Sequence, residues 1–264
     1  MLKGAMHLHS RYSDGEFTLE ELSKIFLAEN CSFLCMTDHA EYFDEETVQR
    51  YIAECELLSD ATFRMVPGLE YRCERDMHIL GYGATRLPQT KDPQEVIRHI
   101  DAQEGVSVIA HPKNEFFEWI ESFATLPQGI ETWNSKYDGR YAPRPGTFAL
   151  LQRLRQRTPG MHAFYGLDLH WKNQFRSFFV NLECDSAESV TVLAALAAGK
   201  YSAQKDGLQL PSSGILPEQL LEQFDRVHQR SDRRRRFAKE VKKTLDRLGI
   251  RVPESVKAQL RRIF

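Results

Sequence analysis

The sequence lacks the features that mark membrane, secreted and disulfide-rich proteins. Its 264 residues hold no apolar run near the ~18–20 residues that cross a bilayer. No hydrophobic stretch precedes the polar residues that begin at His7, so a signal peptide is not expected. The five cysteines form no CxxC pair and no regular framework, which indicates reduced thiols. We therefore expect a cytoplasmic protein without a transmembrane segment.

Internal repeats are absent, and so are low-complexity segments before the C-terminal part of the chain. Hydrophobic residues make up 42% of the sequence and charged residues 27%, which is typical of a globular protein. The net charge of −2 conceals an asymmetry, because residues 211–264 contain 14 Lys or Arg against 7 Asp or Glu and the rest carries −9. The sequence thus predicts a mildly acidic domain at 1–210 and a basic helical extension at 211–264.

The first domain alternates short apolar segments with amphipathic ones. Helix starts are marked by capping residues at positions 18, 44, 92 and 185, and a further helix is predicted around residues 150–154. Strands are predicted at 5–9, 33–37, 63–71, 78–82, 106–110, 130–133, 163–167 and 178–182. Strands that alternate with helices predict βα units in a parallel sheet or barrel. Residues 204–214 are rich in turn formers and are expected to end the domain.

The basic extension is predicted to form two helices. One apolar stripe covers residues 220–227, a second covers 237–248, and Gly249 ends the second helix. A run of four arginines, Arg233–Arg236, lies between the stripes. Either the stripes pack on the first domain and the arginines are solvated, or the arginines bind nucleic acid or an acidic membrane surface.

Six of the nine histidines lie at the ends of predicted strands, together with carboxylates. His7 and His9 are one residue apart, so strand alternation places both imidazoles on one face, as two ligands of one metal ion require. Asp168 and His170 repeat this spacing. In parallel α/β barrels the reactive groups lie at the C-terminal ends of the strands. Nitrogen and oxygen donors without thiolates suit Mn²⁺, Zn²⁺ or Fe²⁺.

These motifs resemble, in order, those of the PHP (polymerase and histidinol phosphatase) family of metal-dependent phosphoesterases. The resemblance runs from His7 to about Gly207. The matching motifs are His7-Leu8-His9-Ser10, Ser13-Asp14-Gly15, Thr37-Asp38-His39, Gly68-Leu69-Glu70, His78, Ala110-His111-Pro112 and Asp168-Leu169-His170. The resemblance implies a distorted (β/α)7 barrel with up to three divalent metal ions in a cleft at the strand C-termini.

Carried over position by position, the resemblance implies three groups of metal ligands. The first ion is held by His7, His9, Glu70 and Asp168; the second by Glu70 as a bridge with His78 and His111; the third by Asp14, His39 and His170. The Ser-Asp-Gly motif is more similar to the family branch that acts on nucleotides and nucleic acids than to histidinol phosphatases.

Phosphoryl transfer also calls for fixed cations beside the metal ions. Lys113 and Arg140 are favoured, since both follow strand ends in the half of the barrel that supplies the second ion. The other candidates are Arg11, Lys136 and Lys172. Asp38 either orients its neighbour His39 through a hydrogen bond or acts as the acid that protonates the leaving group.

Further residues near the motifs have two possible roles. Tyr71, Trp133 and Trp171 either stack on a base of the substrate or pack at the rim of the barrel. The segment 137–145, with two prolines and two tyrosines, is a loop able to cover a cleft.

The sequence therefore predicts a hydrolase that cleaves phosphate esters by metal-activated water, with a nucleotide or short oligonucleotide as substrate. One alternative is a small-molecule phosphatase of the histidinol phosphate or sugar phosphate type. An amidohydrolase would need a metal-bridging lysine near mid-chain, whereas Glu70 can serve as the bridge here. A non-catalytic PHP binding module would be expected to have lost ligands, and all nine positions are present.

Overall fold

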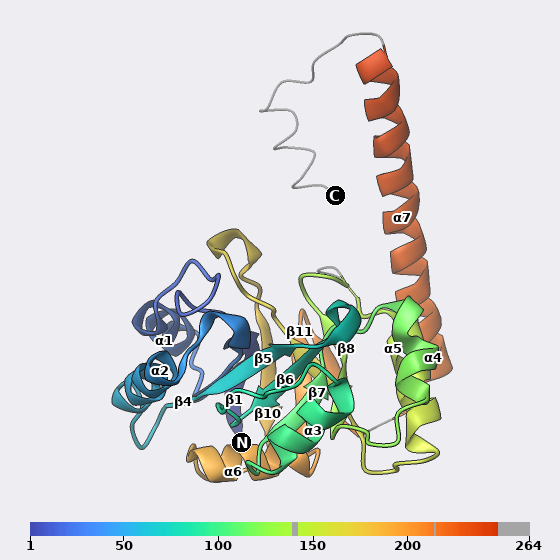
Figure 1. The fold of residues 1–264 in the computed structure, drawn as a ribbon. Helices are drawn as coiled ribbons and strands as arrows, with labels where there is room; N and C mark the ends of the chain where they lie inside the picture. The colour runs from blue at the N-terminus through green and yellow to red at the C-terminus, as the bar shows by residue number, and fades with distance from the viewer. Residues whose placement is uncertain (139–141, 214, 248–264) are drawn as a thin grey trace. The chain divides into compact units, whose positions relative to one another are not determined.

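The computed structural model describes residues 1–138, 142–213 and 215–247 (Figure 1). The chain divides into two compact units, Met1–Leu216 and the remainder from Pro217. The first unit runs slightly beyond the boundary at residue 210 that the charge distribution suggests, because a last strand and its following turn complete its sheet.

The first unit has mixed α/β structure. Its strands are β1 (Leu2–Leu8), β2 (Phe33–Met36), β3 (Asp38–His39), β4 (Arg64–Val66), β5 (Gly68–Arg72), β6 (His78–Tyr82), β7 (Val106–Ile109), β8 (Gly129–Asn134), β9 (His162–Gly166), β10 (Phe178–Leu182), β11 (Tyr201–Lys205) and β12 (Leu208–Pro211). Its helices are α1 (Leu19–Ala28), α2 (Glu45–Leu57), α3 (Pro93–Asp101), α4 (Phe117–Glu121), α5 (Pro145–Arg155) and α6 (Ser189–Ala197).

Local capping explains where the helices begin. Thr18 and Glu21 form a capping box, in which the Thr18 hydroxyl accepts from the Glu21 N–H at 3.1 Å and the Glu21 carboxylate accepts from the Thr18 N–H at 2.8 Å. Asp44 caps α2 and Asp92 caps α3, so these three predicted starts are confirmed. The helix predicted from residue 185 begins later, at the first residue of α6.

The strands form two six-stranded sheets, in the orders β12-β11-β10-β1-β2-β4 and β3-β5-β6-β7-β8-β9. β2 continues into β3, and β4 continues into β5, so each of these chain segments joins both sheets. The single strand predicted at 63–71 is therefore wrong, because Pro67 separates two strands and has no N–H to donate to a ladder. The second sheet meets β1 again after β9, through a parallel bridge between Leu8 and Leu169.

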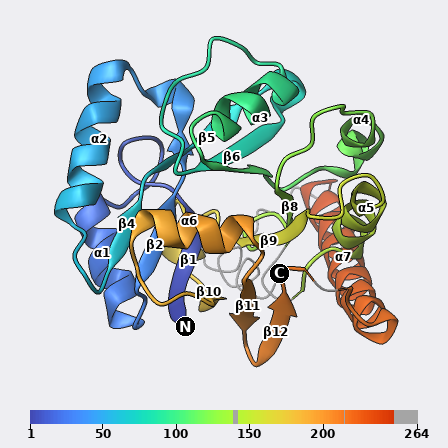
Figure 2. The same cartoon turned by 90° about the horizontal axis from the view of Figure 1, so that it is seen from below.

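The predicted parallel sheet or barrel is only partly observed, because parallel and antiparallel strand pairs both occur. β6 runs antiparallel to both β5 and β7, because the few residues between β5 and β6 allow a turn but no crossover helix. Residues 204–214, predicted as a turn-rich end of the domain, include the end of β11, a hairpin turn and β12 at the edge of the first sheet (Figure 2). Its turn is Asp206-Gly207, with φ of 48° and 80°, as a tight hairpin requires. The distorted (β/α)7 barrel stays a prediction.

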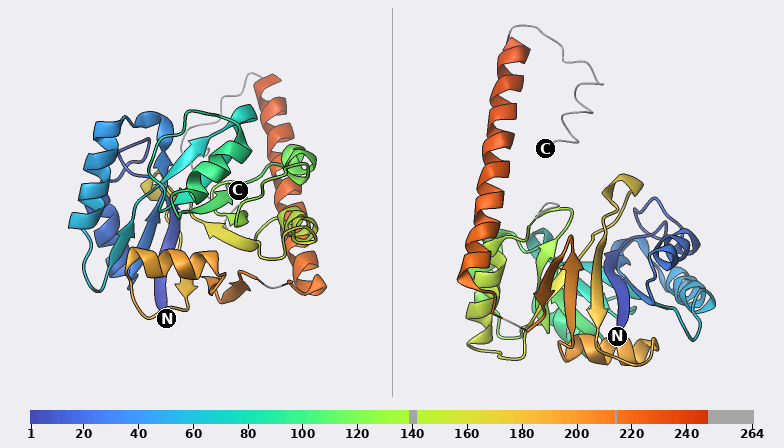
Figure 3. Two further views of the ribbon diagram at one scale, coloured as in Figure 1. Left: turned by 60° about the horizontal axis from the view of Figure 1, so that its bottom comes forward. Right: turned by 180° about the vertical axis from the view of Figure 1, so that it is seen from behind.

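The core lies between the sheets and their covering helices, with fully buried side chains that include Leu8, Phe33, Leu80, Val108 and Phe164. Burial of each such side chain contributes about 1.5–3 kcal/mol. Helix α6 packs against β4, β7 and β10, strands of both sheets, and lies across the end of the unit from which β1 starts (Figure 3). The opposite end, where β1 finishes at Leu8, is left to the polar residues of the motifs.

In the described part of the second unit, residues 217–247, the chain forms one helix, α7 (Glu218–Arg247). The prediction of two helices is wrong, because arginine is a good helix former and neither glycine nor proline interrupts residues 227–237. Gly249, which we expected to end the second helix, lies outside the described residues. Within the part of the chain that the structure describes, no helix is long and apolar enough to cross a membrane.

Candidate metal centre

The site begins with an irregularity at the end of β1. Met6 pairs with Cys35 and Leu8 with Met36, so His7 is an extra, unpaired residue in the ladder, with φ of 61°. This is a β-bulge, and it re-aims the His7 side chain. His9 follows the strand, and the two imidazole centroids are 5.2 Å apart. The imidazoles therefore meet as predicted, but through a bulge and not through plain strand alternation.

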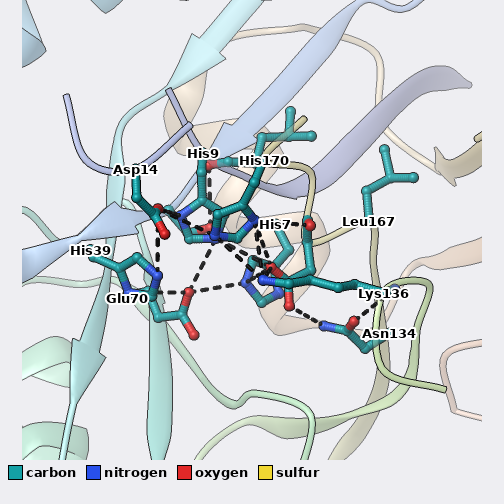
Figure 4. Close-up of polar contacts among 12 residues, drawn as sticks. His7, His9, Asp14, His39, Glu70, Asn134, Lys136, Leu167 and His170 are labelled. Atoms are coloured by element: carbon teal, nitrogen blue, oxygen red, sulfur yellow. Dashed lines mark hydrogen bonds and ion pairs between the residues drawn. The ribbon is translucent and has the colours of Figure 1, made fainter. Parts of the chain in front are cut away.

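The other proposed ligands reach the same place from separate elements. His39 ends β3, Glu70 lies in β5, His111 follows β7, and Asp168 with His170 follows β9. His78 is the first residue of β6, and because β6 runs in the opposite direction, its start lies beside the ends of its neighbours. Asp14 comes from the loop after β1, and Figure 4 shows its carboxylate beside His9, His39 and His170.

These residues form four overlapping groups, and within each group the donor atoms lie within 4.8 Å of one another. The groups are His9, Asp14, His39 and His170; His7, His9 and Asp168; His7, Glu70 and His111; and His39, Glu70 and His78. All nine predicted ligands are included. His9 joins the Asp14 group as well as its own, so the division of ligands among three separate ions stays a prediction.

Glu70 lies at the centre of the cluster and is 1% exposed. One oxygen is 2.6 Å from His78 Nδ1 and 3.2 Å from His111 Nε2, and the other is 3.1 Å from His7 Nε2 and 3.2 Å from His9 Nε2. Burial alone would raise the pKa of Glu70, but the surrounding imidazoles outweigh burial and hold the pKa well below its usual range. A carboxylate whose two oxygens each face other proposed ligands suits a position that bridges two metal ions.

Three of the proposed ligands have left-handed backbone conformations that non-glycine residues rarely adopt. The φ angles are 61° for His7, 28° for His111 and 53° for Asp168. Each such residue costs on the order of 1–2 kcal/mol, and strain of this kind concentrates at functional sites. His7 and Asp168 lie on the two segments that pair through the bridge between Leu8 and Leu169.

Unpaired nitrogen atoms indicate that the cluster fits a cation. Both ring nitrogens of His9 and Nδ1 of His39 are buried and have no hydrogen-bond partner of good geometry among the described residues. A buried polar atom without a partner costs about 1–3 kcal/mol, which a metal ion would relieve. Burial lowers the pKa of His9 to about 3 and so keeps the imidazole neutral, the form that binds metal. The nitrogen and oxygen donors fit Mn²⁺, Zn²⁺ or Fe²⁺ alike.

Two residues that the sequence analysis did not propose for the site, Glu131 and Asn134, form hydrogen bonds with the proposed ligands. Glu131 is fully buried, lies 2.7 Å from His7 Nδ1, and accepts a hydrogen bond from the His111 N–H at 2.9 Å. Asn134 donates to Glu131 at 3.0 Å and to Asp168 at 3.1 Å. In the sequence, Glu131 could have been recognised as an acidic residue inside the apolar strand predicted at 130–133.

Asp38 contacts the loop after β1 and not the imidazole of His39. It is fully buried and accepts hydrogen bonds from the N–H of Ser10 at 2.7 Å and the hydroxyl of Ser13 at 2.7 Å. The contacts of Asp38 hold the loop that carries Asp14. Both proposed roles, orienting His39 and protonating the leaving group, stay predictions, because the hydrogen bonds of Asp38 go to Ser10 and Ser13.

The structure places a different cation at the cluster from those favoured by sequence. Lys136 Nζ lies 3.0 Å from Asp168 Oδ1 and 3.3 Å from His170 Nδ1. Burial alone would lower the pKa of Lys136, but the Asp168 carboxylate outweighs burial and the pKa is raised. Lys113 instead faces Glu115, at 4.0 Å, and Arg140 lies outside the described residues.

Of the three aromatic residues noted in the sequence, two are buried. Tyr71 donates a hydrogen bond to the Ala84 carbonyl at 3.1 Å, and the Trp133 ring lies 4.6 Å from that of Phe178. Both therefore pack in the core and cannot stack on a substrate. Trp171 is half-exposed beside His170.

Comparisons with known proteins agree with this geometry at the level of fold. No family model matches the chain. An alignment over 77 residues is 27% identical to the DNA polymerase/3′-5′ exonuclease PolX of Bacillus subtilis; it covers 26% of this chain and only 14% of that protein. PsfC from Pseudomonas syringae has a TM-score of 0.51 at 13% identity, covering 84% of this chain and 93% of PsfC.

A two-domain protein from Bacteroides vulgatus, which contains a predicted PHP-like metal-dependent phosphoesterase, has a TM-score of 0.54 at 16% identity. The match covers 85% of this chain and 69% of that protein. At this identity the likeness concerns the fold. The chain therefore has a PHP-like fold, as its ordered motifs predict.

Proposed function

We propose that this chain is a metal-dependent phosphoesterase of the PHP type. The observation that carries the proposal is the convergence of nine imidazole and carboxylate side chains around Glu70 in four overlapping groups. Divalent ions held there would polarise a phosphoryl oxygen and lower the pKa of a water molecule, so that hydrolysis proceeds by metal-activated water near neutral pH.

The exposure of the ligands defines the side from which a substrate approaches. His7 and His9 are fully buried, whereas His78 is 18% exposed and Asp14 is 36% exposed. The substrate therefore enters over Asp14 and His78. Lys136 lies at this cluster as the cation that binds a phosphoryl oxygen, a role for which Lys113 and Arg140 are the candidates from sequence.

A nucleotide or short oligonucleotide is the proposed substrate class. It is supported by the Ser13-Asp14-Gly15 motif and by the short match to an exonuclease-containing polymerase. A small-molecule phosphatase of the histidinol phosphate or sugar phosphate type is the second candidate, and a non-catalytic binding module the third. The buried, unpaired nitrogens of His9 favour a metal-loaded enzyme over an empty module.

The proposed function is tested by a screen of phosphomonoesters, phosphodiesters and nucleotides with Mn²⁺, Zn²⁺ or Fe²⁺. We expect hydrolysis that a chelator removes and added metal restores. Asp168→Ala should lose activity by about 100-fold or more, because it removes a ligand and the partner of Lys136. Asp185→Ala, a change at an exposed acid, is the matched control. Protein with bound metal that hydrolyses no ester would disprove the proposal.

The basic helix is proposed as a second contact for an anionic polymer such as nucleic acid. Replacing Arg233, Arg234 and Arg236 by Gln should weaken oligonucleotide binding and flatten its salt dependence, because fewer counterions are released. Hydrolysis of a small ester should not change. If oligonucleotide binding is unaltered at every salt concentration, the arginines are solvated surface charges.

The proposed cytoplasmic location rests on the reduced cysteines.

A further inference from the structure

Two aromatic side chains beside the metal ligands are about half exposed. Tyr137 is 48% exposed and Trp171 is 47% exposed. The Tyr137 ring lies 4.5 Å from the ring of His111, and the Trp171 ring lies 5.4 Å from that of His170. The two aromatic rings thus border different ligand groups of one cluster, and each side chain is about half open to solvent.

One cation lies close to both rings. Lys136 Nζ is 5.1 Å from the centre of the Tyr137 ring and 6.0 Å from that of the Trp171 ring. The same ammonium contacts Asp168, and Figure 4 shows the Lys136 side chain extending to His170. A phosphoryl group held at the cluster would therefore meet a positive charge that is flanked by two aromatic rings.

The backbone that carries these exposed side chains is firmly held. Asn134 Oδ1 accepts hydrogen bonds from the N–H groups of Lys136 at 3.0 Å and Tyr137 at 3.1 Å. Gln174 Oε1 accepts from the N–H of Trp171 at 3.1 Å. Aromatic side chains on a fixed backbone lose little conformational entropy when a ligand covers them, so their exposure is suited to binding.

The chemistry of this arrangement selects a ring-bearing phosphate ester. An open aromatic face gains from stacking on a planar ring beyond the gain from apolar contact alone. Stacking on a protein side chain tolerates any nucleobase, because every base has a π face. An aliphatic group of similar size would fill the same space without this gain.

We propose that Tyr137 and Trp171 form a subsite for a planar aromatic ring of the substrate, with Lys136 binding the phosphoryl group of the same molecule. The inference rests on the proposed phosphoesterase function and adds the residues that select the leaving group.

The test compares phenylphosphonate with cyclohexylphosphonate as ligands of the Mn²⁺-loaded full chain. Neither carbon–phosphorus bond is hydrolysed, so dissociation constants can be measured by calorimetry without turnover. The two probes share the anion and the ring size and differ in aromaticity. We expect phenylphosphonate to bind about three- to tenfold more tightly.

Variants assign the preference to residues. Trp171→Ala and Tyr137→Ala should each reduce the preference toward one, whereas Trp171→Phe and Tyr137→Phe should keep most of it. Lys136→Gln should weaken both phosphonates by similar factors and leave their ratio unchanged. Leu57→Ala, a truncation of an exposed apolar residue, is the control, and Mn²⁺ binding by each variant checks that it is folded.

The outcomes separate the two proposals. Equal binding of both phosphonates, or a preference that survives both alanine variants, overturns the aromatic subsite and leaves the phosphoesterase proposal intact. If neither phosphonate binds to protein with confirmed bound metal, the phosphate site itself fails, and the subsite fails with it.

Discussion

Glu131 lies 2.7 Å from Nδ1 of His7, on the other side of the imidazole from Glu70, which is 3.1 Å from Nε2. A proton on Nδ1 donated to Glu131 leaves the lone pair of Nε2 free for a metal ion. Carboxylates that hold a ligating imidazole in this way fix its tautomer and orientation. The second oxygen of Glu131 accepts hydrogen bonds from the N–H of His111 and the amide of Asn134, so one buried side chain organises several parts of the site.

Glu131→Gln should therefore weaken Mn²⁺ binding by about 10–100-fold, because the amide donates where the carboxylate accepts. Calorimetric titration of the metal-free protein measures the change. Glu121→Gln, at a surface acid paired with Arg153, is the matched control and should bind metal as the wild type does. Equal metal affinity in the two variants would show that Glu131 is a structural acid only.

The last position of the Ser-Asp-Gly motif, Gly15, requires a residue without a side chain. A Cβ atom at Gly15 would collide with the backbone carbonyl of His9, whereas a Cβ at Gly160 would meet nothing within 4 Å. Gly15→Ala should destabilise the protein by about 1–3 kcal/mol and weaken metal binding, because the loop that carries Asp14 must move. Gly160→Ala should be neutral or stabilising by up to about 1 kcal/mol. Urea unfolding compares them, and similar stabilities would contradict the prediction.

Asp38 can be tested as an acid through the leaving group. If Asp38 only holds the loop at Ser10 and Ser13, Asp38→Asn should slow hydrolysis of p-nitrophenyl phosphate and of glycerol phosphate by the same factor. An acid that protonates the leaving group matters most for the poor leaving group, glycerol. A loss that is about tenfold larger for glycerol phosphate would therefore identify Asp38 as the acid.

Asp138 should make stability depend on pH. Burial raises the pKa of Asp138 to about 6. The hydrogen bond from the Asn134 N–H at 2.8 Å and the ion pair with Arg144 at 3.0 Å lower the pKa but do not cancel the effect of burial. The folded state thus keeps a proton that the unfolded state releases near pH 4, so stability falls as pH rises between about 4 and 6. Relative to Asp138→Asn, the free energy of unfolding of the wild type should fall by up to about 3 kcal/mol across this range. Chelated protein unfolded in urea at several pH values provides the measurement, and parallel curves would refute the prediction.

Much of the site follows from local sequence. Capping residues such as Thr18 and Asp44 act within one helical turn, and they mark the helix starts correctly. All nine proposed metal ligands are imidazoles or carboxylates, and most lie at strand ends, so their types and order are visible in the chain. The structure accordingly brings all nine proposed ligands together.

The features that were missed depend on contacts between distant segments. His7 and Glu131 are 124 residues apart in the sequence, and no local pattern announces their contact. Lys136 was one of several basic residues after strand ends, and only the position of Asp168 distinguishes it from Lys113.

The sequence by itself therefore determined the kinds of donor atom, their order along the chain and the starts of α1, α2 and α3. Tertiary structure alone decided the reversed direction of β6, the bulge at His7 and the choice of Glu131 and Lys136 as neighbours of the cluster. The reason is physical: capping and ligand chemistry act over a few residues, whereas strand pairing and buried charge contacts are settled only when both sheets close around the site.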